Sequence, residues 1–163
     1  MDIRAETPAD IDSIYALTKA AFDPMPFSDG READCVNKLR ADGDLHISLV
    51  ALEGDEIVGH IAFSPVTISG TEGVWYGLGP VSAEPSRQKS GIGSALIKTG
   101  LQMLKERDVA GCVLIGNPDY YHRFGFVGDG KITYRDLEAR IVQWISLDGS
   151  EPSGVVTYSP GLE

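Results

Sequence analysis

A glycine-rich turn between a strand and a helix is the feature of this sequence that most constrains its fold. Residues 74–81 form a strand-like run, and residues 92–107 follow with polar and apolar stripes on opposite faces of a predicted helix. The short apolar run 112–115 predicts a second strand. A strand, a helix and a strand in this order form a crossover unit, so the two strands are expected to be parallel.

The other strand-like runs predict antiparallel neighbours for this parallel pair. Residues 47–52 and 57–66 flank the turn sequence 53–56, a pattern that is typical of a β-hairpin. Residues 141–147 and 155–158 predict a second, closing hairpin near the end of the chain. The predicted sheet is therefore mixed.

Two helices are expected ahead of the first hairpin. Thr7 and Pro8 are typical of a helix cap and a first helical residue, and Pro24 and Pro26 end the apolar stripe that follows. A second helix is predicted between residues 28 and 40. Together these elements predict the α/β class, with a mixed, mostly antiparallel sheet flanked by helices.

Length and charge limit the number of domains and the kinds of partner. The 163 residues suit a single domain, with a core in 1–130 and C-terminal strands or a hairpin in 131–163. The 14 Lys and Arg against 24 Asp and Glu give a net charge of −10, which disfavours nucleic acid and membranes and favours a cationic partner. Solubility alone is the alternative explanation of this charge. Because no signal peptide and no apolar run of about 20 residues is recognised, a cytoplasmic location is expected.

Cysteine and histidine do not form a metal-binding pattern. Cys35 and Cys112 stand far apart, and His46, His60 and His122 are scattered along the chain. Zinc sites need clustered ligands, so no metal is expected. The Gly-x-Ser-x-Gly turn of serine hydrolases is also absent.

The turn at residues 88–94 is the candidate ligand site. It leaves a strand and opens the predicted helix, so free backbone N–H groups are expected to converge at the start of that helix. Gly91 and Gly93 leave the backbone open to a phosphate, while Arg87 and Lys89 add positive charge. These features favour a diphosphate. The alternative is that the glycines only permit tight packing.

Two common nucleotide-binding patterns do not fit this turn. A Walker A loop requires Gly-Lys followed by Ser or Thr, which is missing. The dinucleotide fingerprint requires a third glycine where Leu96 stands. Triphosphate hydrolysis and NAD binding are therefore disfavoured.

Gln88, Gly91 and Gly93 match the motif of Arg or Gln, two residues, Gly, one residue, then Gly or Ala. With this motif the chain resembles the GNAT superfamily of N-acetyltransferases. The resemblance to its YhbS-like branch extends to residues 59–66, 79–81 and 120–126. The matching segments follow the order expected for the family and cover roughly residues 1–130.

The resemblance implies an acetyl-CoA-dependent transferase that acts on an amine of a small molecule or a protein. In such a fold two central parallel strands splay apart, pantetheine enters the gap near Val81, and the diphosphate lies on the amides from Lys89 to Ser94. Asn117 is a further implied contact, with an Asn-Pro turn as its alternative. The cofactor-binding residues implied in this way are Val81, Gln88, Lys89, Ser90, Gly91, Ile92, Gly93, Ser94 and Asn117.

Amine attack on a thioester needs an oxyanion donor, a proton source for sulfur and a route for the amine proton. The family spacing implies Tyr121, four residues before Gly125, as the general acid, with Tyr120 as its structural rival. His60 is the candidate base. Many relatives carry a glutamate or histidine where this chain has residues 75–77, so we predict that the proton leaves through water.

The absence of a glutamate or histidine at residues 75–77 leaves an alternative function open, a non-catalytic module that binds acyl-CoA as a sensor or holds a partner. The acceptor pocket is expected from the first two helices, residues 24–30 and the C-terminal hairpin, where no motif identifies the acceptor. A homodimer formed through a sheet edge or this hairpin is a further open interpretation.

Overall fold

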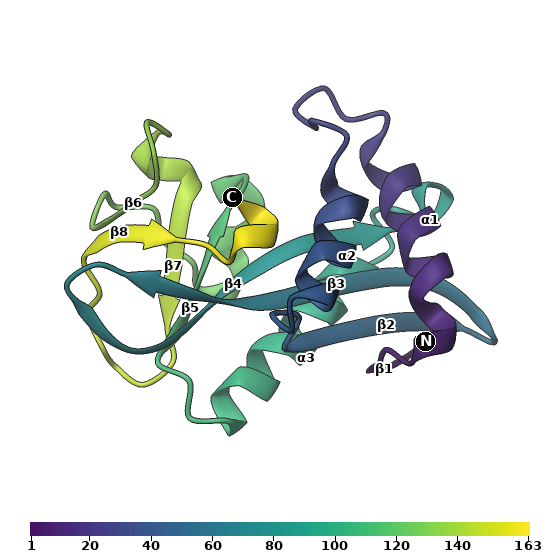
Figure 1. Cartoon of the computed structure of the whole chain (residues 1–163), viewed down its shortest axis with the longest axis horizontal. Coiled ribbons are helices and arrows are strands. Elements are labelled where there is room, and N and C mark those ends of the chain that lie inside the picture. The colour runs from purple at the N-terminus through teal and green to yellow at the C-terminus, as the bar shows by residue number, and fades with distance from the viewer.

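The computed structural model describes residues 1–163 and contains four α-helices and eight β-strands (Figure 1). The helices are α1 (Ile11–Phe22), α2 (Glu32–Ala41), α3 (Ile92–Glu106) and α4 (Pro118–Tyr121). The strands are β1 (Asp2–Ala5), β2 (Ile47–Glu53), β3 (Glu56–Ile68), β4 (Thr71–Ala83), β5 (Gly111–Ile115), β6 (Ile132–Thr133), β7 (Val142–Ser146) and β8 (Gly154–Thr157). Short 3-10 turns lie at Pro8–Asp10, Pro85–Arg87, His122–Phe124, Ala139–Ile141 and Pro160–Leu162. None of the helices has the length and apolar content needed to span a membrane.

One sheet organises the chain, and its main path runs in the order β1-β2-β3-β4-β5-β7. β4 and β5 are parallel, whereas the other neighbours on this path are antiparallel. The mixed, mostly antiparallel sheet is therefore confirmed. So is the parallel pair that the crossover unit predicted.

The parallel pair is joined only at its base. Residues 75–77 of β4 pair with residues 111–113 of β5. Beyond Gly77, β4 continues to Ala83 with β3 as its only strand neighbour. The two central strands therefore diverge, and the edge of β4 that faces β5 is left without a strand partner.

β4 contains a bulge within this diverging part. Leu78 lies opposite Phe63, and Val81 lies opposite Ile61. Gly79–Pro80 therefore stands opposite a single residue of β3, which is the two-against-one arrangement of a β-bulge. The bulge reshapes β4 just after it leaves β5.

Helices cover both faces of the sheet. On one face, α3 packs Leu96 against the Ile61 side of β3. On the other, α1 and α2 lie side by side over β2 and β3 (Figure 1), and Ile14 and Val36 pack against Val50. The sheet is thus the middle layer, with a hydrophobic core on each face.

The predicted closing hairpin is wrong, because β7 and β8 do not pair with each other. β7 takes the outer edge of β5. β8 pairs with residues 67–68 of β3 and with β6. The reason is that β3 is 13 residues long and runs past its last pairing with β2 at Phe63, so its far end has a free edge for β8.

Candidate active site

The glycine-rich turn joins the end of β4 to the start of α3. Gly91 precedes the helix with a φ of 90°, a left-handed conformation that favours glycine. The first bond of α3 runs from the Ala95 N–H to the Gly91 carbonyl, so the N–H groups of residues 92–94 have no partner within the helix. Residues 88–91 are exposed, and Ile92 is buried and anchors the turn. These amides are therefore available to an anion.

Basic side chains lie both on the turn and beside α3. Arg87 and Lys89 are exposed on the turn itself. A cavity of about 320 Å³ beside α3 is lined by Lys98, Lys105 and Arg123 together with apolar side chains. Sequence reasoning missed this second group. The two lysines stand seven residues apart on one helix face and could have signalled it, but only the fold brings Arg123 to them.

The residues predicted along the cofactor path lie at the point where the central strands diverge. Val81 is partly buried and packs against the core beneath α3. Asn117 follows β5 and caps α4, because its side-chain oxygen accepts a hydrogen bond of 2.9 Å from the Asp119 N–H. This geometry fits the Asn-Pro turn, and it leaves the two N–H donors of the side-chain amide for another partner.

Tyr120 and Tyr121 occupy different environments although they are neighbours on α4. The Tyr121 ring packs against Phe126 and over Gly116, where an added Cβ would lie 2.6 Å from the ring. Burial raises the pKa of Tyr121 to about 12, so its hydroxyl stays protonated at neutral pH. The Tyr120 hydroxyl lies 3.4 Å from the place of a Cβ at Gly93, close to the start of α3. Tyr121 is thus a partly buried donor packed in the core, and Tyr120 is the neighbour of the anion site.

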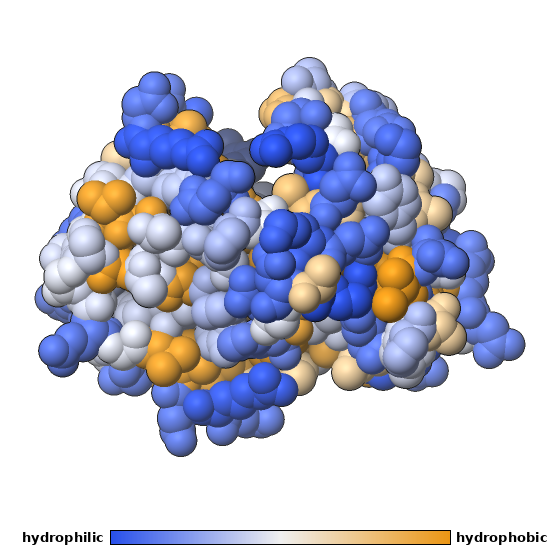
Figure 2. Space-filling view, in the orientation of Figure 1, coloured by the Kyte–Doolittle hydropathy of each residue, from blue (hydrophilic) through white to orange (hydrophobic).

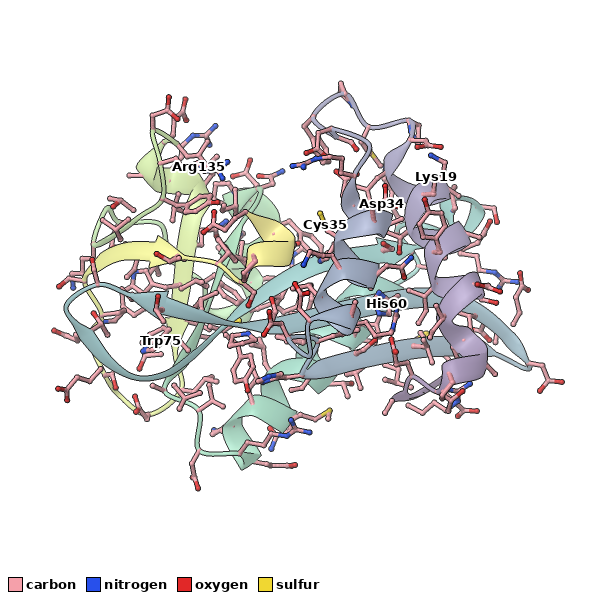
Figure 3. All side chains as sticks on the ribbon, in the orientation of Figure 1. Lys19, Asp34, Cys35, His60, Trp75 and Arg135 are labelled. Carbon is pink, nitrogen blue, oxygen red and sulfur yellow. The ribbon has the colours of Figure 1, made fainter.

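His60 lies on β3 beneath α1 and α2 and has no exposed surface (Figure 3). Its Nε2 is 2.8 Å from Ser48 Oγ, and Ser48 donates a hydrogen bond to the Glu6 carboxylate, which pairs with Arg40 at 2.8 Å. Burial lowers the pKa of His60 to about 4, with the charge of Glu6 acting in the opposite direction. His60 is therefore neutral at pH 7, and its burial prevents direct contact with an acceptor amine in this structure.

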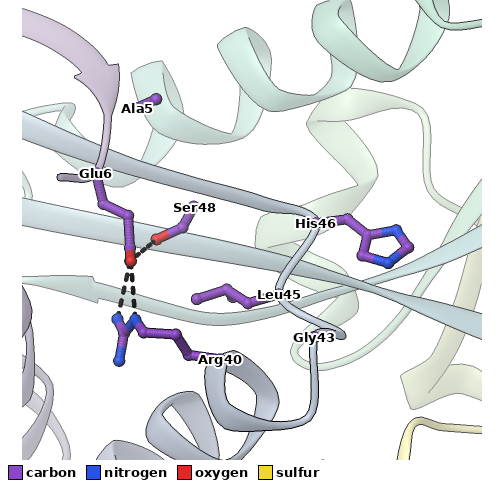
Figure 4. Close-up of a pocket in the computed structure, with 7 residues that line it drawn as sticks. All are labelled: Ala5, Glu6, Arg40, Gly43, Leu45, His46 and Ser48. Carbon is purple, nitrogen blue, oxygen red and sulfur yellow. Dashed lines mark hydrogen bonds and ion pairs between the residues drawn. The ribbon is translucent and has the colours of Figure 1, made fainter. Parts of the chain in front are cut away.

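A cavity of about 250 Å³ opens at the other end of this hydrogen-bonded chain (Figure 4). Glu6, Arg40, Ser48 and His46 are among its lining residues. The polar chain therefore leads from the sealed His60 side chain to an open cavity beside β1 and β2.

A notch divides the surface into two lobes, one carrying β6 and the other the segment between α1 and α2 (Figure 2). Hydrophilic side chains cover both walls of the notch in this view. Cys35 of α2 and Arg135 lie on its opposite sides (Figure 3). No group of three or more His, Cys, Asp or Glu side chains in the molecule is placed to hold a metal ion.

Comparison with known proteins places this geometry in a family. Residues 2–127 match the model of the acetyltransferase (GNAT) domain. The N-acetyltransferase YhbS of Escherichia coli (strain K12) is 38% identical over 127 residues, which are 77% of this chain and 73% of that protein.

Two solved structures share the fold over 99% of this chain. A GNAT family acetyltransferase from Brucella melitensis, in complex with acetyl-CoA, has 42% identity and a TM-score of 0.88, with 97% of that chain covered. YhbS from Escherichia coli, in complex with CoA, has 30% identity and a TM-score of 0.87, with 91% of that chain covered. The resemblance inferred from the glycine-rich turn is therefore confirmed, and the chain belongs to the GNAT family of acetyltransferases.

Proposed function

We propose that the protein is an acetyl-CoA-dependent N-acetyltransferase that moves an acetyl group to a primary amine by direct attack in a ternary complex. The observation that carries this proposal is the set of exposed N–H groups at the start of α3, beside the β4 edge that is free beyond Gly77. The first feature can hold a diphosphate and the second can pair with an extended chain of amides. Acetyl-CoA contains both parts.

The two related structures support the choice of cosubstrate, since one was solved with acetyl-CoA and the other with CoA. We assign the diphosphate to the amides from Lys89 to Ser94, next to Gln88. The pantetheine arm follows β4 at Val81, and the free N–H groups of Asn117 reach it from the other side of the gap.

Tyr121 is the general acid in this proposal. When the amine adds to the thioester carbonyl, a carbon–nitrogen bond forms and the oxygen becomes negative; the carbon–sulfur bond then breaks and sulfur leaves as a thiolate. The Tyr121 hydroxyl gives its proton to that sulfur. Its raised pKa, which reflects burial, supports this role because it keeps the phenol protonated until the thiolate forms.

The proton lost by the amine leaves through water rather than directly to a side chain. His60 is fully buried beneath α1 and α2, so it acts on the amine proton only through intervening groups. The chain through Ser48 to Glu6 links it to the open cavity and is the route by which it would exchange protons. His60 is thus a relay in this proposal and not a group that touches the amine.

The acceptor is a cationic amine of a small molecule or a protein, which the net charge of −10 attracts.

We propose that residues 1–163 act as one domain and that the protein works in the cytoplasm. The free thiols of Cys35 and Cys112 support that location. A homodimer is a further proposal, supported by β1, which ends the sheet path and has one edge without a partner.

Calorimetry with acetyl-CoA and CoA tests the cofactor site. Lys89→Glu places a negative charge beside the proposed diphosphate and is expected to weaken binding by about tenfold or more. Lys19→Glu, at an exposed lysine of α1, makes the same change in net charge away from the turn and is the matched control. No heat from the unaltered protein at millimolar ligand, or equal weakening by both substitutions, would contradict this site.

Turnover is tested by following CoA release with a panel of primary amines. Amine-dependent release supports transfer. Binding of acetyl-CoA without such release from any amine would instead assign the protein the role of a non-catalytic acyl-CoA sensor.

A further inference from the structure

Tyr121 and the water relay leave one role of the transfer unfilled, the donor that stabilises the oxyanion. The strand beside the expected acyl group is poorly equipped for it. Pro80 stands in the bulge of β4 and has no backbone N–H. A side chain from another element is therefore the better candidate for this donor, an inference that rests on the proposed function.

Tyr158 lies at the base of the gap between the central strands. Its ring packs over Gly77, where an added Cβ would lie 2.7 Å from the Tyr158 Cε1 atom. Gly77 is the last residue of β4 that pairs with β5 before the two strands diverge. The Tyr158 ring therefore occupies the position where the gap begins.

Tyr158 approaches this gap from the face opposite α3. It packs with the core cluster that contains Val66, Trp75 and Val113, whereas Tyr121 packs with the cluster beneath α3. Tyr158 directly follows β8, which runs beside the end of β3 (Figure 1). The two phenols thus flank the diverging strands from opposite sides.

Neighbouring contacts hold the backbone and ring of Tyr158 in place. Its N–H donates a hydrogen bond of 2.9 Å to Glu163, and Ser159 Oγ donates one of 2.7 Å to the Pro65 carbonyl. The Tyr134 ring meets the Tyr158 ring edge to face at 5.1 Å. A donor held in this way loses little entropy when it binds a ligand.

The Tyr158 hydroxyl itself is free. Its oxygen is not one of the fully buried polar atoms that lack a hydrogen-bond partner, and the residue is partly exposed. Burial of the ring raises the pKa of Tyr158, and the Cys112 thiol on the neighbouring strand adds to this effect. The ring lies over Gly77, which pairs with Val113, so the phenol stands beside β5. The raised pKa keeps it protonated as a donor.

We propose that Tyr158 is a catalytic residue whose hydroxyl donates a hydrogen bond to the carbonyl oxygen of the acetyl thioester. When the amine forms its bond to the carbonyl carbon, the electron pair of the C=O bond moves onto that oxygen, and Tyr158 holds the charge. The pair returns when the carbon–sulfur bond breaks. Tyr158 keeps its own proton throughout, while Tyr121 supplies the proton to sulfur.

The test uses acetonyl-CoA labelled with carbon-13 at its ketone, a thioether analogue that cannot transfer its acyl group. Bound to the unaltered protein, the ketone carbon is expected to shift downfield because its oxygen accepts a hydrogen bond. Tyr158→Phe keeps the ring over Gly77 and removes only the hydroxyl, so most of this shift should disappear while the affinity changes by no more than about twofold. With an amine that supports CoA release, the kcat of Tyr158→Phe should fall about a hundredfold.

Tyr15→Phe is the matched control, because it removes the hydroxyl of a partly exposed tyrosine of α1, which donates a hydrogen bond of 2.9 Å to Asp34 of α2. Its shift and kcat should equal those of the unaltered protein. An equal ketone shift with and without the Tyr158 hydroxyl would overturn the role of Tyr158 but would leave the proposed cosubstrate in place. Absence of acetonyl-CoA binding by the unaltered protein would overturn the proposed cosubstrate as well. If Tyr158→Phe fails to fold, 3-fluorotyrosine at position 158 replaces it: a more acidic phenol should enlarge the shift, and an unchanged shift overturns the proposal.

Discussion

His60 Nε2 lies 2.8 Å from Ser48 Oγ, and this contact fixes the tautomer of a buried imidazole. Ser48 has one hydroxyl proton and donates it to the Glu6 carboxylate, which can only accept. The Ser48 oxygen must therefore accept the Nε2–H of His60. Nδ1 is left with its lone pair and has no partner in the interior. The ring is thus neutral and polarised by Glu6 through one hydroxyl.

This arrangement predicts that acid destabilises the fold through His60. The pKa of His60 is 6.5 when unperturbed and about 4 in the folded protein, so the unfolded chain binds a proton first as the pH falls. The free energy of unfolding should therefore decrease from pH 6.5 toward pH 4, by up to about 1.4 kcal/mol per pH unit. Urea unfolding at pH 7, 6 and 5 measures this slope.

His60→Gln is the control for this slope, because it removes the titrating group and keeps a polar side chain. The charged groups that act on His60 are Glu6 and Arg40. The pKa of Glu6 is lowered below 4.5 by its bonds to Arg40 and Ser48 against the opposing effect of burial, so it stays ionised between pH 7 and 5. Parallel pH profiles for the two proteins in this window would contradict the prediction.

Tyr121→Phe should lower the kcat about a hundredfold and leave acetyl-CoA affinity unchanged. The reason is that the variant loses the proton that general acid catalysis supplies to sulfur, while the ring still packs against Phe126. Steady-state kinetics and calorimetry measure the two quantities. Tyr120→Phe is the comparison that decides between the neighbours: a larger fall in kcat for this variant would transfer the role to Tyr120.

The sequence predicted the part of the fold whose signals are local. The crossover unit and the turn at residues 88–94 were both predicted correctly, because glycine placement and helical periodicity report directly on a helix that starts after a strand. The first hairpin was predicted for the same reason, since a short turn sequence joins β2 and β3. These elements form the framework of the candidate site.

The rest of the site depends on contacts between distant segments. No pattern near residues 155–158 indicates that β8 joins the far end of β3, so the predicted hairpin was wrong and nothing in the sequence placed Tyr158 near the candidate site. The environment of His60 likewise depends on Glu6 and Arg40, which come from different elements. Such residues carry no local spacing signal, and only the folded chain brings them together.

Gly100→Ala should destabilise the protein by about 1–3 kcal/mol, since it overfills the core. Gly100 is a buried residue of α3, and a methyl group there would overlap the ring of fully buried Phe63. The gain in helix propensity, about 1 kcal/mol, is smaller than the cost of displacing this ring. Urea unfolding measures the change. A variant as stable as the unaltered protein would show that α3 can move away from β3 freely.

Gly93→Ala makes the same substitution on the same helix and should have the opposite effect on stability. A Cβ at Gly93 would lie no closer than 3.4 Å to its nearest neighbour, the Tyr120 hydroxyl, so alanine fits and should stabilise the helix by about 0.5–1 kcal/mol. The motif that Gly93 matches accepts alanine at this position, so the methyl group should leave the neighbouring amides open to the diphosphate. Acetyl-CoA affinity should therefore stay within about twofold of that of the unaltered protein, in contrast to the weakening expected for Lys89→Glu. Calorimetry alongside urea unfolding measures both effects, and a more stable Gly93→Ala protein that has lost acetyl-CoA binding would contradict the match of Gly93 to this motif position.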